Sequence, residues 1–444
     1  MNSHELFIKT PPLKLFIIAA LPGAVSMLAS ALYQLIDGIF VGRILGPTPF
    51  AALNLAMPFV IINFALADLI GVGSSVPISI SLGEGRDREA HNIFTCACIM
   101  IIVSGIITGT IIYAAAPSLM RLMGADGEFA AYAVMYLRVY ALCSPVTTII
   151  FAVDNYLRIC GIIRGSMLLN IFMALLSAVL EFLFLYVFRW GIWAAALATC
   201  LGMAVSACVA FIPFFSGKQR LRFCVPHFNR RIIKRIFVCG SPSFLSNIAG
   251  RITSVLMNFF LVRLGGQDAV SIYGILMYAD GIIQSILYGM CDSLQPSVGY
   301  NWGAREYKRV KSIEKCCFTA SGIFSVIAAI VMFAFPKQTV ILFMGNAEGA
   351  FLSAAVFAVK LFSITYLTRW ISFASQSFML AIEKPMPASV ISISISLVFP
   401  VIFIFALMPL GLTGMWLNLA VSSLLSGILA VFILIKTVKN GLTH

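Results

Sequence analysis

The sequence LPGAVSMLASALYQLIDGIFVGRILG, residues 21–46, recurs in diverged form as SPSFLSNIAGRITSVLMNFFLVRLGG at residues 241–266, and this internal repeat indicates the fold. Identical residues recur at one offset of 220 positions, and the pairs are Pro22 with Pro242, Phe40 with Phe260, Arg43 with Arg263 and Gly191 with Gly411. A further stretch, FAVDNYLRI from Phe151, resembles FASQSFMLA from Phe373 at an offset of 222. Apolar composition alone is a poor explanation for Pro, Gly and Arg matched at one offset, so we expect two similar halves.

The composition places both halves in a membrane. Of 444 residues, 61% are hydrophobic and only 11% are charged, with a mean hydropathy of +1.00 and a net charge of +13. Soluble proteins carry about 25% charged residues. The chain therefore cannot cover a water-facing surface, which excludes a soluble enzyme or a nucleic-acid-binding domain. A membrane protein with basic cytoplasmic loops explains both excesses at once.

Twelve stretches are long and apolar enough to span a bilayer, which takes about 20 residues each. The fold class we predict is an all-α polytopic membrane protein with two six-helix lobes related by a pseudo-two-fold axis along the membrane normal. The lobes would be 1–215 and 236–444, joined by a basic cytoplasmic linker at 216–235. Parallel repeats of this kind are a common plan of secondary transporters, with substrate bound between the halves. The expected spans are 15–41, 51–81, 92–117, 130–157, 166–188, 191–215, 236–262, 270–298, 316–335, 351–379, 387–408 and 412–435.

Lysine and arginine gather on one side of this topology, chiefly at 218–235 and 305–315. The positive-inside rule then places both termini in the cytoplasm of a multi-pass inner-membrane protein. The first span is too long for a cleaved signal peptide, and further spans follow it. The opposite side has only five basic residues, which are Arg43, Arg121, Arg189, Arg263 and Lys337.

Neither the cysteines nor the histidines indicate a metal site or a bound cofactor. Nine of the 11 cysteines fall inside expected spans, where cysteine acts as a small apolar residue. The four histidines fall in loops or at the termini. We therefore expect no disulfide framework, no metal site and no cofactor beyond an H⁺ or Na⁺ gradient.

Charged residues inside the expected spans are functional candidates by default, because each costs a few kcal/mol to insert. Asp37 lies near the outer end of the first span, with Tyr33 one turn earlier on the same face. Glu181 lies about two turns from the outer end of the fifth span, and Ser177 precedes it by one turn. Thr199 could add a hydroxyl from the sixth span. An excess of buried carboxylate suits proton or sodium coupling, because the site must alternate between charged and neutralised forms.

Other intramembrane groups have more open roles. Asp154 is a candidate that could instead pair with Arg158 one turn on, and Asp280 and Asp292 are weaker candidates. Arg251, Lys360 and Arg369 in the second half are either structural partners of acids or functional groups. Polar residues that could line a substrate cavity, together with Asp154, are Tyr33, Gln34, Asn155, Gln284 and Gln376.

Four stretches resemble the multidrug and toxic compound extrusion (MATE) family over essentially the whole chain. They are YQLIDGIFVGRILG from Tyr33, FAVDNYLRICG from Phe151, SAVLEFLFLYVFRWGIWAAALAT from Ser177 and LQPSVGYNWGAREYKRV from Leu294. The GYNWGA stretch is most similar to the bacterial MepA-like branch.

The resemblance implies an antiporter that expels small organic cations and drugs, often aromatic, while H⁺ or Na⁺ runs inward. It also implies a cation site at Asp37 and Glu181. At the family's Asn one turn before the fifth-helix acid this chain has Ser177, and its sixth-helix Thr matches Thr199. The family's fourth-helix Asn falls at Asp154. A serine in place of that Asn and a Glu in place of Asp favour a proton-coupled site over a standard sodium site. The transporter would act as a monomer in the lipid bilayer, without nucleic acid.

Two alternatives stay open. A lipid-linked oligosaccharide flippase of the same architecture would need a basic cavity for pyrophosphate, for which Arg251, Lys360 and Arg369 are candidates. A membrane-embedded transferase or hydrolase would need a nucleophile motif or a histidine in the spans, and the sequence has neither there. We therefore expect a transporter and not an enzyme.

Overall fold

The computed structural model describes residues 4–217, 219–344 and 348–441, and these residues are helical almost throughout, with no strand. Lys218, part of the expected basic linker, lies outside the described residues. The first half contains η1 (Glu5–Lys9), α1 (Pro12–Phe40), η2 (Val41–Leu45), α2 (Pro47–Gly83), α3 (Asp87–Leu122), α4 (Gly127–Thr147), α5 (Ile149–Ile159), α6 (Ile163–Phe182), η3 (Leu183–Val187) and α7 (Ile192–Phe215). The second half contains α8 (Arg230–Asp292), α9 (Gln295–Gly303), α10 (Tyr307–Ala334), α11 (Pro336–Met344), α12 (Gly349–Ser363), α13 (Tyr366–Ala381), α14 (Pro385–Ile393), η4 (Ser394–Val398), α15 (Phe399–Ala406), η5 (Met408–Leu410) and α16 (Gly411–Gly441).

The helices are long enough to cross a membrane many times. In the described residues, ten helices pass a length and hydropathy test, or eleven when the bent pair Gly349–Ser363 and Tyr366–Ala381 is one span. The longest, Arg230–Gly303, has 74 residues and is broken at Gly266, where φ is 62° and ψ is −148°. When this helix is divided at Gly266 and the bent pair is counted as one span, the described residues contain the expected twelve spans.

The internal repeat is visible in the backbone. Left-handed residues, which end or break helices, recur at the offsets found in the sequence. Most of them are glycines, because glycine has no Cβ to clash. The exceptions are Arg189, Arg305 and Glu383, with φ of 53°, 62° and 57°. Pairs 220 apart are Gly46 with Gly266, Gly85 with Arg305 and Gly191 with Gly411, and pairs 222 apart are Gly127 with Gly349 and Gly161 with Glu383.

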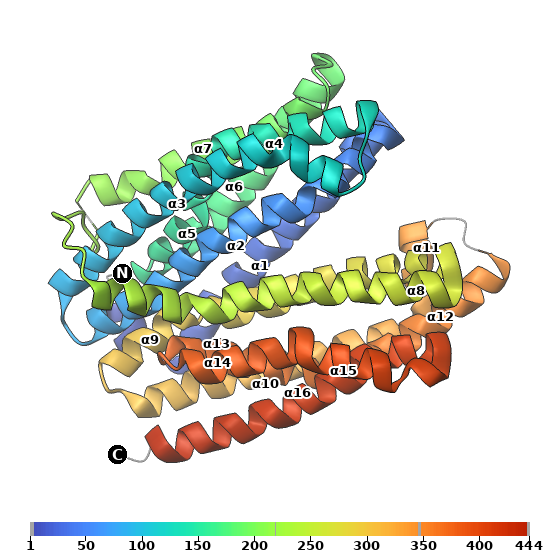
Figure 1. The fold of residues 1–444 in the computed structure, drawn as a ribbon. Helices are drawn as coiled ribbons and strands as arrows, with labels where there is room; N and C mark the ends of the chain where they lie inside the picture. The colour runs from blue at the N-terminus through green and yellow to red at the C-terminus, as the bar shows by residue number, and fades with distance from the viewer. Residues whose placement is uncertain (1–3, 218, 345–347, 442–444) are drawn as a thin grey trace. The chain divides into compact units, whose positions relative to one another are not determined.

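Contacts divide the chain into two compact units, and their bounds differ slightly from the halves of the repeat. The first unit comprises Met1–Thr10, Val25–Phe244 and Gly299–Arg305, and the second comprises Pro11–Ala24, Leu245–Val298 and Glu306–His444. In the first unit α2, α3 and α4 pack against one another and α7 packs against α4 and α6, and in the second α13 packs against α10 and α16 (Figure 1). Each unit has its own apolar core.

The first long helix of each repeat begins in one unit and continues in the other. α1 changes unit after Ala24 and α8 changes unit after Phe244, which are 220 residues apart. Each change of unit follows two residues after a proline inside the helix, Pro22 or Pro242. The start of α1 therefore belongs to the second unit, and the start of α8 belongs to the first unit.

Glycines hold these exchanged helix starts against the backbone of a neighbour. In the first unit a Cβ atom on Gly240 would lie 1.8 Å from the carbonyl oxygen of Leu69. In the second unit a Cβ atom on Gly289 would lie 2.4 Å from the carbonyl oxygen of Gly23. Leu69 and Gly289 occupy corresponding positions of the repeat, 220 residues apart. The same close approach of helix backbones therefore occurs once in each unit.

The substitution Gly240→Ala tests this contact. The added methyl group must push α8 away from α2, and overpacking of this kind lowers the free energy of unfolding by about 1–3 kcal/mol. The matched control is Gly250→Ala on the same helix, where nothing lies within 4 Å of the added atom. We expect thermal unfolding of the detergent-purified protein to show a lower Tm for Gly240→Ala only. Equal Tm values for the two variants would contradict the contact.

Candidate functional site

A buried acidic pair lies in the first unit. Asp37, on the part of α1 that belongs to this unit, is 5% exposed, and Glu181, in the last turn of α6, is 0% exposed. The two carboxyl groups contact each other. These turns of α1 and α6 carry no other charged residue, and the two acids meet only because the helices pack against each other.

The acidic pair is poorly satisfied by hydrogen bonds. Within the described residues, neither carboxylate oxygen of Glu181 nor Oδ1 of Asp37 has a hydrogen-bond partner. Two ionised carboxylates in contact repel each other, and burial removes the water that would screen them. A proton or another cation must therefore accompany the second negative charge.

Hydroxyl groups from three helices surround the acidic pair. The Tyr33 hydroxyl lies beside Glu181 and 2.6 Å from Oγ1 of Thr199 on α7. Thr199 also donates to the carbonyl oxygen of Ala195 at 3.3 Å. Tyr140 on α4 contacts Thr199, and its ring centroid is 5.2 Å from that of Tyr136.

Tyr136 and Tyr140 are the members of this cluster that sequence reasoning missed. They are 0% and 5% exposed, and the Tyr136 hydroxyl has no hydrogen-bond partner among the described residues. Two tyrosines one helical turn apart inside an apolar span were the available signal, because a buried phenol needs a polar partner.

Ser177, the remaining residue of the expected coupling site, is buried at the contact between α6 and α7. A Cβ atom on Gly202 would lie 2.0 Å from its Oγ. Ser177 therefore lies one turn from Glu181 on α6 and packs on the helix that carries Thr199.

The second repeat contains an apolar version of the same place. Met257 corresponds to Asp37 at the offset of 220, and Phe362 corresponds to Tyr140 at the offset of 222. Both are 0% exposed and belong to the apolar core of the second unit. The helices thus pack without carboxylates at this position, so the fold alone does not require Asp37 and Glu181.

Asp154 lies in a different polar network of the first unit. Its carboxylate forms an ion pair with Arg158 at 2.6 Å and accepts hydrogen bonds from Ser166 at 2.5 Å and from Asn170 at 2.8 Å. Arg158 is 3% exposed and also donates to Ser166 at 3.0 Å. These contacts neutralise Asp154 and tie α5 to α6.

The other polar candidates of the first unit are on separate helices. Gln34 is exposed on α1, one residue from Tyr33. The Asn155 amide donates to the carbonyl oxygen of Phe151 at 3.2 Å, within α5. Neither side chain is among the contacts of the acidic pair.

An ion pair dominates the polar residues of the second unit. Arg369 on α13 lies 3.0 Å from Asp280 on α8, which also accepts hydrogen bonds from Tyr366 at 3.1 Å and Gln284 at 3.0 Å. Asp280 thereby has three donors. Arg369 has an acidic partner, and Gln284 is occupied by the same network.

Further polar side chains of this unit have varied surroundings. Asp292 accepts hydrogen bonds from Gln295 at 2.9 Å and from Ser377 at 3.0 Å. Gln376 is buried, and its carbonyl oxygen lacks a partner among the described residues.

The remaining basic residues of the second unit differ from Arg369. The Lys360 ammonium lies 5.7 Å from the centroid of the Phe333 ring. Arg251 is exposed, and no acid pairs with it in the part of the chain that the structure describes.

The sequence of this chain matches a known protein family over most of its length. The MatE family model matches residues 22–183 and 242–406, which is most of the chain and again shows an offset of 220 between the halves. The chain belongs to the MatE family. It is therefore a multi-pass membrane transporter and not an enzyme. The alternative of a membrane-embedded transferase or hydrolase is excluded.

Two curated MatE relatives match nearly the full length of the transporter. The multidrug export protein MepA of Staphylococcus aureus (strain N315) is 25% identical over 450 residues, which cover 100% of this chain and 98% of that protein. MepA of Staphylococcus haemolyticus (strain JCSC1435) is 25% identical over 428 residues, covering 96% of this chain and 93% of that protein. The expected similarity to the MepA-like branch is confirmed.

Solved structures confirm the fold class. A crystal structure of MATE in complex with MaL6 has a TM-score of 0.93, 23% identity and 98% coverage of each chain. A MOP superfamily transporter from Pyrococcus furiosus, described as having a binding pocket of reverse polarity that suggests a different function, has a TM-score of 0.92, 23% identity and 99% coverage of each chain. The transporter has the twelve-helix, two-lobe fold of these proteins.

The substitution Arg158→Met tests the network around Asp154. Removing one partner of a buried ion pair leaves an uncompensated charge, which costs about 3–5 kcal/mol. We expect a clear loss of Tm in detergent, and we expect Asp154→Asn combined with Arg158→Met to recover much of it. The control is Arg164→Met, because Arg164 is exposed on α6. A Tm for Arg158→Met that equals that of the control would show that the ion pair contributes little.

Proposed function

We propose that the transporter is a secondary active multidrug exporter that moves small organic cations and drugs out of the cell in exchange for H⁺. The acidic pair Asp37 and Glu181 carries this proposal. It is buried, three of its four carboxylate oxygens have no hydrogen-bond partner among the described residues, and Met257 stands in place of Asp37 in the second repeat. The printed function of its MepA relatives, multidrug export, supports the substrate class.

The acidic pair suits coupling because its charge depends on what it binds. With a proton on one carboxyl, the two groups share a single negative charge and their contact is favourable. Without that proton, the excess charge draws in another cation. Exchange follows when a proton from outside and an organic cation from inside stabilise different states of the transporter. Alternating access between the two repeats then carries each cation in one direction.

A proton fits this pair better than a sodium ion. The Tyr33 hydroxyl and Oγ1 of Thr199 are already bonded to each other at 2.6 Å. Ser177, in place of the family's Asn, provides no carbonyl ligand. Hard cations such as Na⁺ prefer a shell of several oxygen ligands. The two carboxyl groups alone make a poor shell, whereas they need nothing else to hold a proton.

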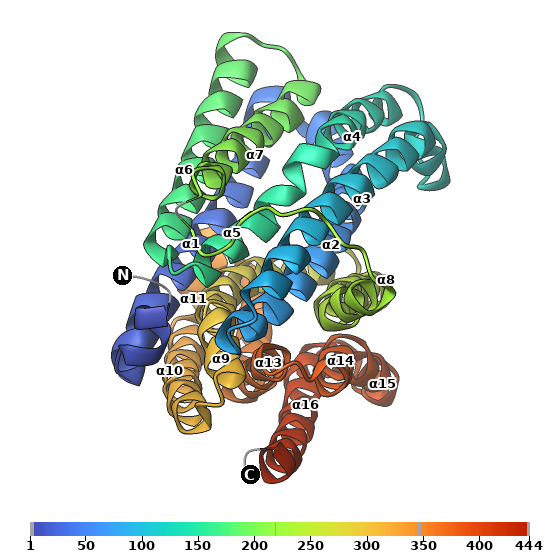
Figure 2. The ribbon, with the colours of Figure 1, turned by 90° about the vertical axis from the view of Figure 1, so that its left-hand side faces the viewer.

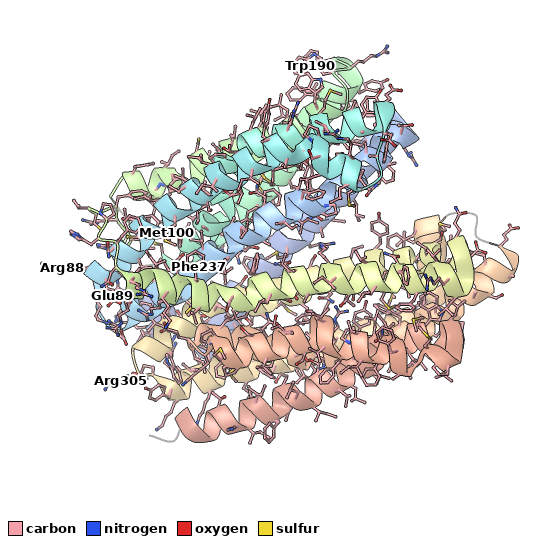
Figure 3. The ribbon with its side chains drawn as sticks, in the orientation of Figure 1. Arg88, Glu89, Met100, Trp190, Phe237 and Arg305 are labelled. Atoms are coloured by element: carbon pink, nitrogen blue, oxygen red, sulfur yellow. The ribbon has the colours of Figure 1, made fainter. Side chains whose placement is uncertain are left out.

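We further propose that both termini face the cytoplasm of a bacterial inner membrane and that the transporter acts as a monomer. Arg88 and Glu89 lie at one end of the first unit and Trp190 at the opposite end (Figure 3). The basic loops lie at the end that carries Arg88 and Glu89. The opposite end carries a group of aromatic residues, in which the ring centroids of Trp190 and Trp193 are 5.6 Å apart. Basic cytoplasmic loops and interfacial tryptophans match this orientation. Both repeats are present in one chain, so a single copy has two lobes.

The substitution Asp37→Asn tests the coupling role. Asparagine cannot release a proton, so efflux of ethidium from energised cells should fall at least about tenfold, the effect of about 1.4 kcal/mol or more in the rate-limiting state. The protein should still fold, because Met257 occupies the corresponding position in an intact core. The control is Asp268→Asn, since Asp268 is exposed. Export by Asp37→Asn at the wild-type rate would exclude the proposed role.

Coupling to H⁺ rather than Na⁺ is tested in proteoliposomes. Addition of ethidium to vesicles with an imposed pH gradient should dissipate that gradient at the same rate with and without Na⁺. Glu181→Gln should abolish this dissipation, because it removes the second acid of the pair. A requirement for Na⁺ would replace the proton in the mechanism.

One observation favours a second candidate function. Arg251 is exposed in a membrane span without an acidic partner among the described residues, which suits an anionic substrate such as a lipid-linked pyrophosphate. Arg251→Gln separates the two functions. A flippase would lose transport of a fluorescent lipid-linked oligosaccharide, whereas the proposed exporter would keep ethidium efflux within about twofold, a change of less than half a kcal/mol.

A further inference from the structure

The loop between α7 and α8 is fixed to the first unit rather than free. We call residues 219–229 the strap; it crosses the helix ends of the first unit in Figure 2. Arg220 is its main anchor and donates to Asp87 at 2.8 and 3.1 Å, to the Leu82 carbonyl oxygen at 3.0 Å and to the Tyr300 hydroxyl at 2.5 Å. These contacts use up the charge and most donors of Arg220.

Three further anchors attach the strap along α3. Asn92 donates to the carbonyl oxygen of His227 at 3.0 Å and accepts from its backbone N–H at 2.8 Å. The backbone N–H of Cys224 donates to Oγ1 of Thr95 at 3.1 Å. The Phe223 ring lies 4.8 Å from that of Phe94. Residues 223–227 of the strap are therefore held against α3.

Other side chains of the strap have no such contacts. Val225 is 74% exposed and Phe228 is 49% exposed. Phe215, at the end of the preceding span, is 73% exposed. Exposed apolar side chains in a connection between two membrane spans are suited to the boundary of the bilayer.

Basic residues occur beside these exposed apolar side chains in the sequence. Arg222, Arg230, Arg231 and Lys234 are exposed, and none of them forms an ion pair within the described residues. The first turn of α8, which holds Arg230 and Arg231, contains no acidic residue. Arg235, one turn further, differs because it lies 3.0 Å from Glu89. The structure thus separates the basic linker into residues that hold it in place and residues with no acidic partner.

The strap lies at the membrane boundary. It follows the span Ile192–Phe215 and leads into the span that begins at Arg230. At this depth apolar side chains enter the boundary of the acyl chains, while lysine and arginine meet the headgroups. Anionic lipids attract each such cation with about 1 kcal/mol. The exposed apolar and basic side chains of one short segment match both layers.

We propose that the strap and the first turns of α8 form a docking surface for anionic phospholipids of the cytoplasmic leaflet. Headgroup phosphates neutralise Arg230, Arg231 and Lys234, and acyl chains cover Val225 and Phe228. Arg220 and the contacts to α3 hold the strap in the orientation that presents these side chains. The bound lipid anchors the start of α8, which changes from one unit to the other after Phe244.

Lipid binding is tested on the purified full-length protein by native mass spectrometry. The protein is titrated with phosphatidylglycerol and, separately, with phosphatidylcholine. We expect phosphatidylglycerol to be retained at lower concentration, and Arg230→Gln combined with Arg231→Gln to weaken its retention about thirtyfold, the effect of two cations at about 1 kcal/mol each. The matched control is Arg88→Gln combined with Arg164→Gln, which removes two exposed positive charges elsewhere in the first unit. This measurement does not depend on the transported substrate.

The outcomes separate the alternatives. Equal retention of the two lipids by the wild-type protein overturns the proposal, and so does an equal loss in the double variant and its control, which would indicate only bulk charge. Tighter binding of an acidic peptide or a short RNA than of phosphatidylglycerol would assign the surface to another partner and overturn it as well. In proteoliposomes, 30 mol% phosphatidylglycerol should raise ethidium transport several-fold for the wild type and the control but not for the double variant. Transport that fails in every lipid while lipid retention behaves as expected would contradict the exporter function and leave the docking surface intact.

Discussion

The bilayer interior contains no water, and this condition governs how the chain folds. Every backbone amide must find its partner within the chain, so the described residues form helices almost throughout. The same constraint makes each buried charge costly unless it has a partner. Arg158 with Asp154 and Arg369 with Asp280 obey this rule through ion pairs. Asp37 and Glu181 contact each other and form no ion pair with a basic residue in the described chain, and by our proposal a proton occupies this place.

The internal repeat builds the transporter from one helical plan used twice. Left-handed residues recur at offsets of 220 and 222, so the helices of both halves end at corresponding positions. Corresponding close approaches at Gly240 and Gly289 bring helix backbones together once in each unit. Function then comes from what differs between the halves. The first repeat carries a carboxylate at Asp37, whereas the second carries Met257 in an apolar core.

The basic residues illustrate how one sequence feature divides into several physical roles. Arg220 holds the strap against the ends of α2 and α3 through Leu82 and Asp87, and Arg235 holds the start of α8 against α3 through Glu89. Arg230 and Arg231 lie between Arg220 and Arg235 in the sequence and have no acidic partner within the described chain. Positive charge in this part of the chain therefore serves internal attachment and, by our proposal, attachment to lipid.

Sequence alone predicts the membrane class, the twelve spans and the repeat, and it singles out Asp37 and Glu181 as candidate coupling residues. These follow from hydropathy, from matched prolines and glycines, and from the scarcity of charge, all of which are local or periodic properties. It left open whether Asp154 and Arg369 are neutralised, and it missed Tyr136 and Tyr140. Only the tertiary structure decided these points, because contacts between side chains on different helices depend on how each helix is rotated and packed. Phenols on α4 lie beside an acid on α1 because the bundle brings those faces together, and hydropathy does not record which face of an apolar helix meets which neighbour.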